Sequence, residues 1–157
     1  MIVKTSRLII KRVRSQEAAS LTPLLKYQSL FRRAGLVSFG KVDLNSLRLL
    51  CRSECVLQIK TRDKQQLLGL IILLRVYGKN GEVFPKKYEI GYLLTPPAQH
   101  GGYMTEALSA VCQELDKYSV KLVAEVKKNN ESSKRVLKRC GFIQIAMKAG
   151  MTEYWER

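Results

Sequence analysis

The sequence predicts an α/β protein: a single domain over residues 1–157, with a mixed, mostly antiparallel sheet of about seven strands and helices on both faces. Three observations lead to this prediction. The chain has 157 residues, 46% of them hydrophobic, which is enough for one compact core and too little for two. Strand-like and helix-like patterns alternate in the order βααβββαβαββ. An Asn-Gly pair at residues 80–81 joins two strand patterns as a hairpin.

The first third of the chain predicts one strand and two helices. Residues 7–13 are β-branched and apolar, which is typical of a strand. A helix is expected to open at Ser15, because apolar residues follow at helical spacing, although Pro23 lies within it. Residues 31–41 hold two glycines and predict a loop or a broken helix. Asp43 is a good N-cap for the second helix.

The middle third predicts three strands. Residues 56–61 alternate between polar and apolar side chains, and residues 67–77 form a long apolar run broken by Gly69. The hairpin turn is expected at residues 78–81, because Asn-Gly supplies the positive φ that such turns need. Residues 87–94 return as a strand, which the following Thr-Pro-Pro ends.

The last third alternates helices with strands. Apolar residues at helical spacing predict a long helix, and a second, shorter helix is expected to end near Gly141, which suits a helix C-terminus. The predicted elements are a helix from Thr105, a strand over 120–126, a helix over 132–139, and strands over 142–148 and 152–155.

Composition argues against several classes of protein. No stretch reaches the roughly 18 apolar residues of a membrane span, and the N-terminus has no apolar segment typical of a signal peptide. The four cysteines form no CxxC pair and fit reduced thiols better than a disulfide framework or a zinc site. His100 is the one histidine, so no metal is expected. We therefore expect a cytoplasmic protein with no membrane partner.

The net charge of +15 is unevenly distributed. Residues 1–62 carry 13 Lys and Arg against three acids, and therefore most of the excess. A basic region attracts polyanions such as nucleic acid, the ribosome, an acidic protein or a phosphorylated ligand. The pattern fits a solvated basic surface equally well. Basic and aromatic residues do not interleave as they do in base-stacking proteins, so nucleic acid is a less favoured partner.

Residues 99–105 are a candidate phosphate-binding loop between a strand and a helix. The loop reads Gln99-His100-Gly101-Gly102-Tyr103-Met104-Thr105. Two glycines let a ligand approach the backbone, and the first amides of the helix are unpaired and carry partial positive charge. A pyrophosphate fits such a site, although the loop is neither a Walker A motif nor GxGxxG. Taken alone, it fits an ordinary strand-to-helix turn equally well.

A wider pattern around this loop resembles the GNAT acetyltransferase superfamily. The matching segments are YEIGYLLTP at 88–96, GYMTEAL at 102–108 and the Asn-x-x-Ser…Gly-Phe pattern at 130–142. The loop matches the motif Gln/Arg-x-x-Gly-x-Gly/Ala at Gln99 and Gly102, while Met104 replaces its final small residue. With the opening TSRLII, the chain is similar to the branch that acetylates the N-termini of ribosomal proteins.

The resemblance implies that acetyl-CoA is the cosubstrate, with its phosphates on the loop at 99–105. It also implies that pantetheine lies between the strand ending at Leu94 and the strand at 122–126. Backbone groups of Tyr92, Leu93 and Leu94 would pair with the pantetheine, and the amide of Leu93 or Leu94 would face the thioester carbonyl. Gly91 fits a bulge or a close backbone approach there, or a glycine tolerated under a packed neighbour.

The resemblance also suggests catalytic residues for acetyl transfer to an amine. Glu125 is expected near the buried end of an apolar strand, where its pKa would be raised, and Glu89 is the second candidate base. Either could instead be a solvent-facing strand residue. Ser133 is the candidate donor to the departing sulfur, and Asn130 the candidate partner of pantetheine or the acceptor. Both also suit helix caps. Lys134, Arg135 and Lys138 could meet the 3′-phosphate or face solvent.

The predicted function is acetyl transfer from acetyl-CoA to a primary amine, either a ribosomal or other protein N-terminus or a small amine. The alternative is a GNAT scaffold with weak or no catalysis that binds the ribosome or nucleic acid through its basic N-terminal third. Residues 28–55 are expected to wall the acceptor site, but they match no specificity pattern. A homodimer is left open, because relatives often pair.

Overall fold

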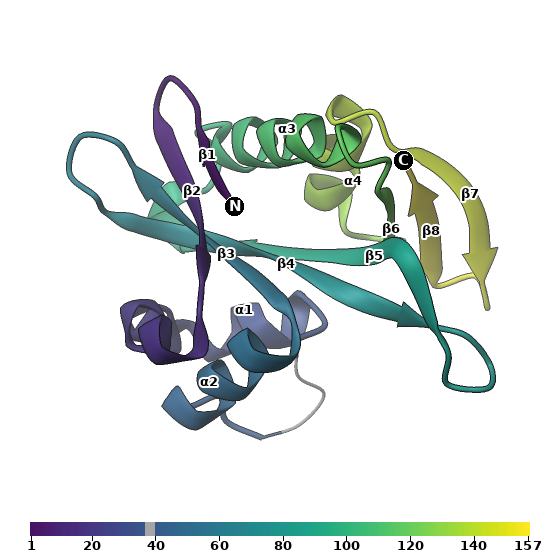
Figure 1. Cartoon of the computed structure of the whole chain (residues 1–157). Coiled ribbons are helices and arrows are strands. Elements are labelled where there is room, and N and C mark those ends of the chain that lie inside the picture. Colours follow the sequence, from purple (N-terminus) through teal and green to yellow (C-terminus); the bar gives the residue numbers. More distant parts are fainter. Residues whose placement is uncertain (37–39) are drawn as a thin grey trace.

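The computed structural model describes residues 1–36 and 40–157, and these contain one eight-stranded sheet in the order β1-β2-β3-β4-β5-β6-β8-β7 (Figure 1). Neighbouring strands are antiparallel except for the parallel pair β5–β6. The strands are β1 (Ile2–Lys4), β2 (Leu8–Val13), β3 (Cys55–Thr61), β4 (Leu67–Tyr77), β5 (Val83–Leu94), β6 (Lys121–Lys127), β7 (Ile143–Lys148) and β8 (Thr152–Glu156).

Helices cover both faces of the sheet (Figure 1). One face carries the 3₁₀ helix η1 (Ser15–Tyr27), α1 (Gln28–Arg33) and α2 (Leu44–Ser53). The other face carries α3 (Tyr103–Asp116) and α4 (Glu131–Arg139), and the short 3₁₀ helix η2 (Pro96–Ala98) leads from β5 toward α3. None of the helices in the described ranges is long and apolar enough to cross a membrane.

The fold class predicted from the sequence is confirmed, with local corrections. The sequence analysis missed β1, and β5 begins at Val83 rather than Lys87. The helix predicted from Ser15 is a 3₁₀ helix, in which Pro23 lacks the amide that an α-helix would use. α3 begins at Tyr103, two residues earlier than predicted. Part of the predicted loop at 31–41 is α1, and residues 37–39 of that loop lie outside the described residues.

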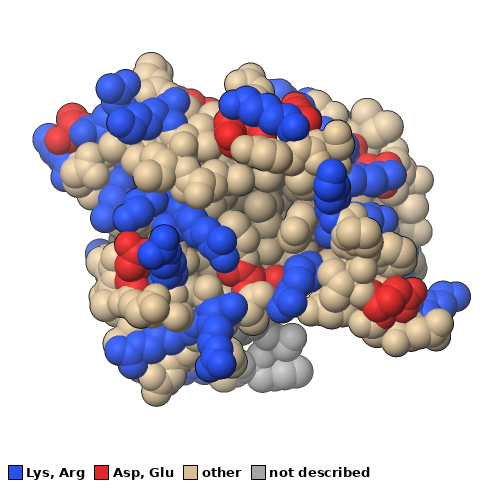
Figure 2. All heavy atoms as spheres, in the orientation of Figure 1, with Lys and Arg blue, Asp and Glu red and all other residues tan. Residues whose placement is uncertain are grey.

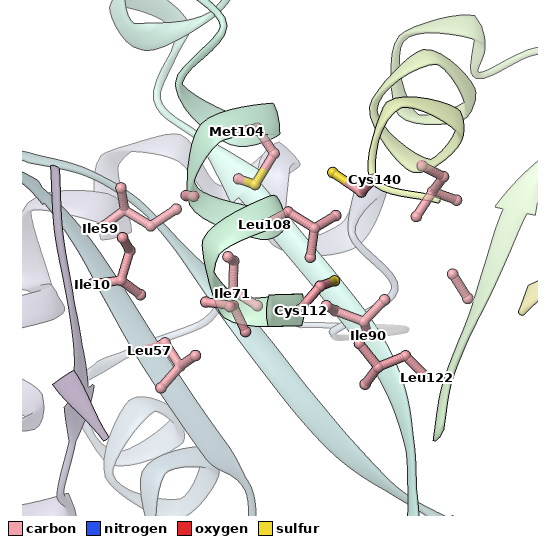
Figure 3. Packing of buried hydrophobic residues seen from close by; sticks show 14 of the residues in the cluster. Ile10, Leu57, Ile59, Ile71, Ile90, Met104, Leu108, Cys112, Leu122 and Cys140 are labelled. Carbon is pink, nitrogen blue, oxygen red and sulfur yellow. The ribbon is translucent and has the colours of Figure 1, made fainter. Parts of the chain in front are cut away.

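Two apolar cores lie on opposite faces of the sheet. Along β5, Ile90 joins the core under α3 and α4, whereas Leu93 joins the core under η1, α1 and α2. This follows from the alternation of side chains along a strand. Figure 3 shows Met104, Leu108 and Cys112 of α3 packing toward the strand residues of the first core. Burial on both faces explains why the middle strands read as continuous apolar runs.

The pairing between β5 and β6 is short. Within the described part of the chain, the two strands pair only over Lys87–Glu89 and Lys121–Val123. Beyond these residues β5 remains paired with β4, and β6 pairs with β8 through its other edge. The two strands therefore separate toward the C-terminal end of β5, as the resemblance implied.

Two strand glycines differ in how closely they are packed. A Cβ at Gly69 of β4 would lie 2.1 Å from the carbonyl oxygen of Leu93 and 2.9 Å from Cα of Leu94. A Cβ at Gly91 of β5 would lie 3.4 Å from Leu36 Cδ2, an ordinary contact, and the β4–β5 register is regular there. No bulge occurs at Gly91, and of the two alternatives the structure matches a glycine tolerated under a packed neighbour. The close approach occurs at Gly69, where it positions the end of β5.

Replacing Gly69 with Ala should destabilise the protein, because the new methyl group would force β5 away from β4. We expect a loss of about 1–3 kcal/mol in the free energy of unfolding. Gly91→Ala is the matched control and should change stability by less than about 1 kcal/mol. Urea unfolding of both variants measures the difference, and equal stabilities would contradict the proposed packing.

Candidate functional site

A cleft of about 810 Å³ lies at the separation of β5 from β6. It is also walled by the loop before α3, by the start of α4 and by the end of α1. Every site residue predicted from the sequence lines this cleft except Gly101. The lining residues among them are Glu89, Tyr92, Leu93, Leu94, Gln99, His100, Gly102, Tyr103, Met104, Thr105, Glu125, Asn130 and Ser133.

The loop before α3 presents backbone amides to the cleft. Gly102 is the N-cap of α3 and has a left-handed φ of 74°, which glycine adopts without strain. Among the described residues, no backbone carbonyl accepts from the amides of Tyr103, Met104 or Thr105, so the first turn of α3 has free donors. Gln99 Nε2 donates to the carbonyl of Leu94 at 3.1 Å and ties the loop back to β5.

Gly101 faces away from the cleft because its carbonyl accepts a hydrogen bond from Arg7. Arg7 Nη1 lies 3.1 Å from this oxygen, and the guanidinium group stacks on Tyr103 at 4.4 Å from the ring centroid. The Nε and Nη2 atoms of Arg7 each lie 2.6 Å from Oε2 of Glu106. One arginine from the start of β2 therefore holds the loop and the first turn of α3 together.

Glu106 completes this arrangement, which we call the Arg7–Glu106 clamp. Its Oε1 accepts from the hydroxyls of Thr5 and Ser6 and from the amide of Arg7. Partial burial raises the pKa of Glu106, but the hydrogen bonds from Thr5 and Arg7 outweigh this and hold the pKa below its ordinary value. No role for Glu106 was predicted from the sequence. The signal for the clamp was the TSR segment at residues 5–7, which is about 100 residues away from Glu106.

Two carboxylates line the cleft on the α1 side of the sheet. Ile90, Ala124 and Val126 belong to the core under α3 and α4. Because side chains alternate along a strand, their neighbours Glu89 and Glu125 point to the opposite, α1 side of the sheet. Burial, and then the charge of Glu125, raises the pKa of Glu89 above its ordinary value. Glu125 is exposed, so the burial expected for it is wrong. The side chains of β6 alternate between buried and exposed positions, and Glu125 lies on the exposed face of the strand.

The start of α4 closes the other side of the cleft. Asn130 caps the helix, because its Oδ1 accepts from the amide of Ser133 at 3.2 Å. The hydroxyl of Tyr92 crosses from β5 and donates to the carbonyl of Ser133 at 3.2 Å. Burial raises the pKa of Tyr92, which keeps this hydroxyl protonated as a donor. Tyr92 thus supports α4 with its side chain, a contact that the sequence analysis did not anticipate.

The three basic residues considered for the 3′-phosphate have different surroundings. Lys134 pairs with Glu131 and Glu153 and also donates to the carbonyl of Lys128. Lys138 lies over the ring of Trp155. Arg135 lines the cleft and is the most accessible to a ligand there.

His100 also lines the cleft, with a positive φ of 65°. The described residues contain no group of three or more His, Cys, Asp or Glu side chains that could hold a metal ion.

Comparisons with known proteins agree with this architecture. A family model described as an acetyltransferase (GNAT) domain matches residues 7–143. The comparison with curated proteins gave no match. A GNAT-family acetyltransferase from Bacillus anthracis is 16% identical, with a TM-score of 0.75, and the match covers 100% of this chain and 98% of that one.

Two further solved structures have the same fold. One is an acetyltransferase from Salmonella typhimurium that modifies the N-terminal serine of 50S ribosomal subunit protein L7/L12. It is 15% identical, with a TM-score of 0.74 over 100% of this chain and 98% of that one. The other is spermidine N-acetyltransferase from Vibrio cholerae, solved with CoA and spermine. It is 13% identical, with a TM-score of 0.74 over 98% of this chain and 96% of that one.

Glu106→Gln should destabilise the protein by about 1–2 kcal/mol at pH 7, because the clamp loses its charge. The pKa of Glu106 is lower in the folded state than in the unfolded state. The stability that its charge contributes is therefore fully present above the ordinary glutamate pKa of about 4.3. It is lost as the pH falls through the pKa of Glu106 in the folded protein. The difference between wild type and variant should therefore shrink toward pH 3.

Thermal melts from pH 7 to pH 3 measure this difference. Glu114→Gln is the matched control, because Glu114 lies on the same helix but pairs only with Lys117 at the surface. It should change stability by less than about 1 kcal/mol at any pH. A difference for Glu106→Gln that stayed constant down to pH 3 would contradict the role of its charge.

Proposed function

Because the chain belongs to the GNAT acetyltransferase family, we propose that it transfers the acetyl group of acetyl-CoA to a primary amine, directly and within a ternary complex. The observation that carries this proposal is the cleft at the separation of β5 and β6. One end of the cleft offers free helix amides for phosphates, and the α1 side offers carboxylates for an amine. The separated strands leave a passage between these two ends.

The phosphate end is built from backbone rather than from basic side chains. Free amides at the start of α3 and the partial positive charge of the helix suit the pyrophosphate of CoA. Met104 stands where the family motif has a small residue, but its side chain is buried in the core and leaves the amides accessible. Arg135 supplies a cation for the 3′-phosphate. The solved spermidine N-acetyltransferase of the same fold contains CoA, which supports this assignment.

For the chemistry, we propose Glu89 as the general base, with Glu125 acting on it through its charge. The raised pKa of Glu89 suits proton removal from an ammonium ion near neutral pH. The amine nitrogen then attacks the thioester carbonyl, and the carbon–sulfur bond breaks. The amide of Leu93 or Leu94 donates to the carbonyl oxygen as it becomes anionic.

The departing thiolate needs a donor at the α4 side of the cleft. The Ser133 side chain lines the cleft there, while its backbone is fixed by Asn130 and Tyr92. We propose that the Ser133 hydroxyl donates to the sulfur. The proton that Glu89 takes from the ammonium ion passes to solvent, and the proton that the nitrogen loses after its attack completes the thiol. The four free cysteines suit a reducing compartment, so we place the enzyme in the cytoplasm.

Acetyl-CoA should raise the melting temperature of the protein, because a ligand at 100 times its Kd stabilises the native state by about 2.7 kcal/mol. Gly102→Val should lose this shift, since a β-branched residue is strained at the left-handed φ before α3. Gly150→Val is the matched control, because Gly150 has a φ of 66° in the turn between β7 and β8.

Each variant is compared with its own melting temperature without ligand. Release of free CoA thiol is then measured with N-terminal peptides, amino acids and polyamines as acceptors. If the wild type shows no thermal shift with acetyl-CoA and releases no thiol with any acceptor, the proposed function is contradicted and a non-catalytic GNAT scaffold is favoured.

Glu89→Gln should lower kcat by about 10²–10⁴-fold with little change in KM for acetyl-CoA, because a general base acts on the amine. Glu125→Gln should retain more activity. Removal of its negative charge should also lower the pKa of Glu89, so the acidic limb of kcat/KM should move to lower pH.

The pH profiles of the wild type and of Glu125→Gln distinguish the two acids, since the titration of the acceptor amine is common to both. If Glu125→Gln abolished turnover while Glu89→Gln remained active, Glu125 would be the base instead.

A further inference from the structure

The end of α1 brings two arginines to the cleft. Arg32 and Arg33 occupy the last turn of the helix, and both line the cleft with Glu89 and Glu125. Ala34, the next residue, has its carbonyl oxygen 3.6 Å from the position of a Cβ at Gly91. Gly91 lies two residues from Glu89 on the same face of β5. The guanidinium groups therefore belong to the same part of the cleft as the carboxylates.

These arginines have no ion-pair partner among the residues that the structure describes. Among the ion pairs between described residues, none involves Arg32, Arg33, Glu89 or Glu125. Other charged residues are used within the fold, as Arg7 is in the clamp and Arg157 is with Asp116. Two free arginines and two free carboxylates thus line the α1 side of the cleft, together with Lys127 two residues after Glu125 on β6, and remain available to a ligand.

Binding of the CoA phosphates does not explain why Arg32 and Arg33 line the cleft. The free amides assigned to the phosphates belong to α3, which packs on the opposite face of the sheet from α1 (Figure 1). A cationic acceptor does not account for them either, because a polyamine would meet like charges at α1. Figure 2 shows Lys and Arg side chains spread over the face in view, with smaller groups of Asp and Glu among them, and the net charge of +15 makes the overall field unfavourable to cations.

We propose that the acceptor carries a carboxylate close to its primary amine, and that Arg32 and Arg33 are the residues that select it. This inference rests on the proposed function, since it concerns the acceptor of the same reaction. The amine lies at Glu89 and Glu125, and the carboxylate pairs with the guanidinium groups, which bind carboxylates in fixed fork geometry. Two acceptors share this chemistry: a peptide N-terminus followed by Asp or Glu, and a free amino acid.

The test compares kcat/KM for peptides that differ only at positions two to four, with acidic, neutral or lysine residues there. The acidic peptide should be acetylated about tenfold better than the neutral one, and the lysine peptide least well. Arg32→Gln/Arg33→Gln should reduce the acidic preference to within about twofold. It should leave the KM for acetyl-CoA unchanged. Added salt should weaken the wild-type preference, because these arginines are exposed.

Arg48→Gln/Arg52→Gln is the matched control, because both arginines lie on α2 outside the cleft lining. It removes the same charge and should retain the preference. Free aspartate and glutamate form a second arm: turnover comparable to the acidic peptide identifies free amino acids, and turnover of peptides alone identifies a protein N-terminus.

Acetylation without any acidic preference would overturn this inference while leaving the proposed function intact. An acidic preference that survived in Arg32→Gln/Arg33→Gln would overturn the role of the arginines. Absence of acetyl-CoA turnover with every amine would instead contradict the proposed function, and the inference with it.

Discussion

The separation of β5 from β6 is the constraint on which the rest of the site depends. Three residues of each strand form a parallel pair. Beyond them, β5 is paired only with β4 and β6 only with β8 among the described strands. A parallel pair needs a crossover, and here α3 provides it and starts at the end of β5. The free amides of the helix, the unpaired edge of β5 and the α4 cap are thereby brought around a single cleft. Gly69 contributes by letting the end of β5 approach β4 closely.

The parts of this fold that the sequence predicted are those governed by local rules. Side-chain alternation, the Asn-Gly turn and the Asp43 cap depend on neighbouring residues, and each matches the structure. β1 was missed because three residues carry too little pattern. The packing at Gly69 and Gly91 depends on the register between β4 and β5. The exposure of Glu125 depends on which face of β6 the core covers. Single residues do not encode these features.

The residues that line the candidate site could be predicted from the sequence, but the contacts that hold them in place could not. Motif spacing indicated the residues that line the cleft, because backbone conformation and glycines leave a local signal. The Arg7–Glu106 clamp joins residues 99 positions apart, and the Tyr92–Ser133 bond joins residues 41 apart. Such contacts exist only after the sheet has formed. The clamp also explains why Gly101, a predicted phosphate ligand, turns its carbonyl toward Arg7 instead of lining the cleft.

In the proposed reaction, the sheet also separates two anion-binding functions that would otherwise compete. Phosphates and an acidic acceptor both favour positive charge, and a strongly basic chain attracts both. On the α3 face the positive potential comes from backbone amides, while on the α1 face it comes from guanidinium side chains. Glu89 and Glu125 line the cleft on the same side as the arginines, so both signs of charge are present there. In the proposed reaction, the carboxylates attract the ammonium group of the acceptor while the arginines attract its carboxylate, which would orient the amine toward the thioester.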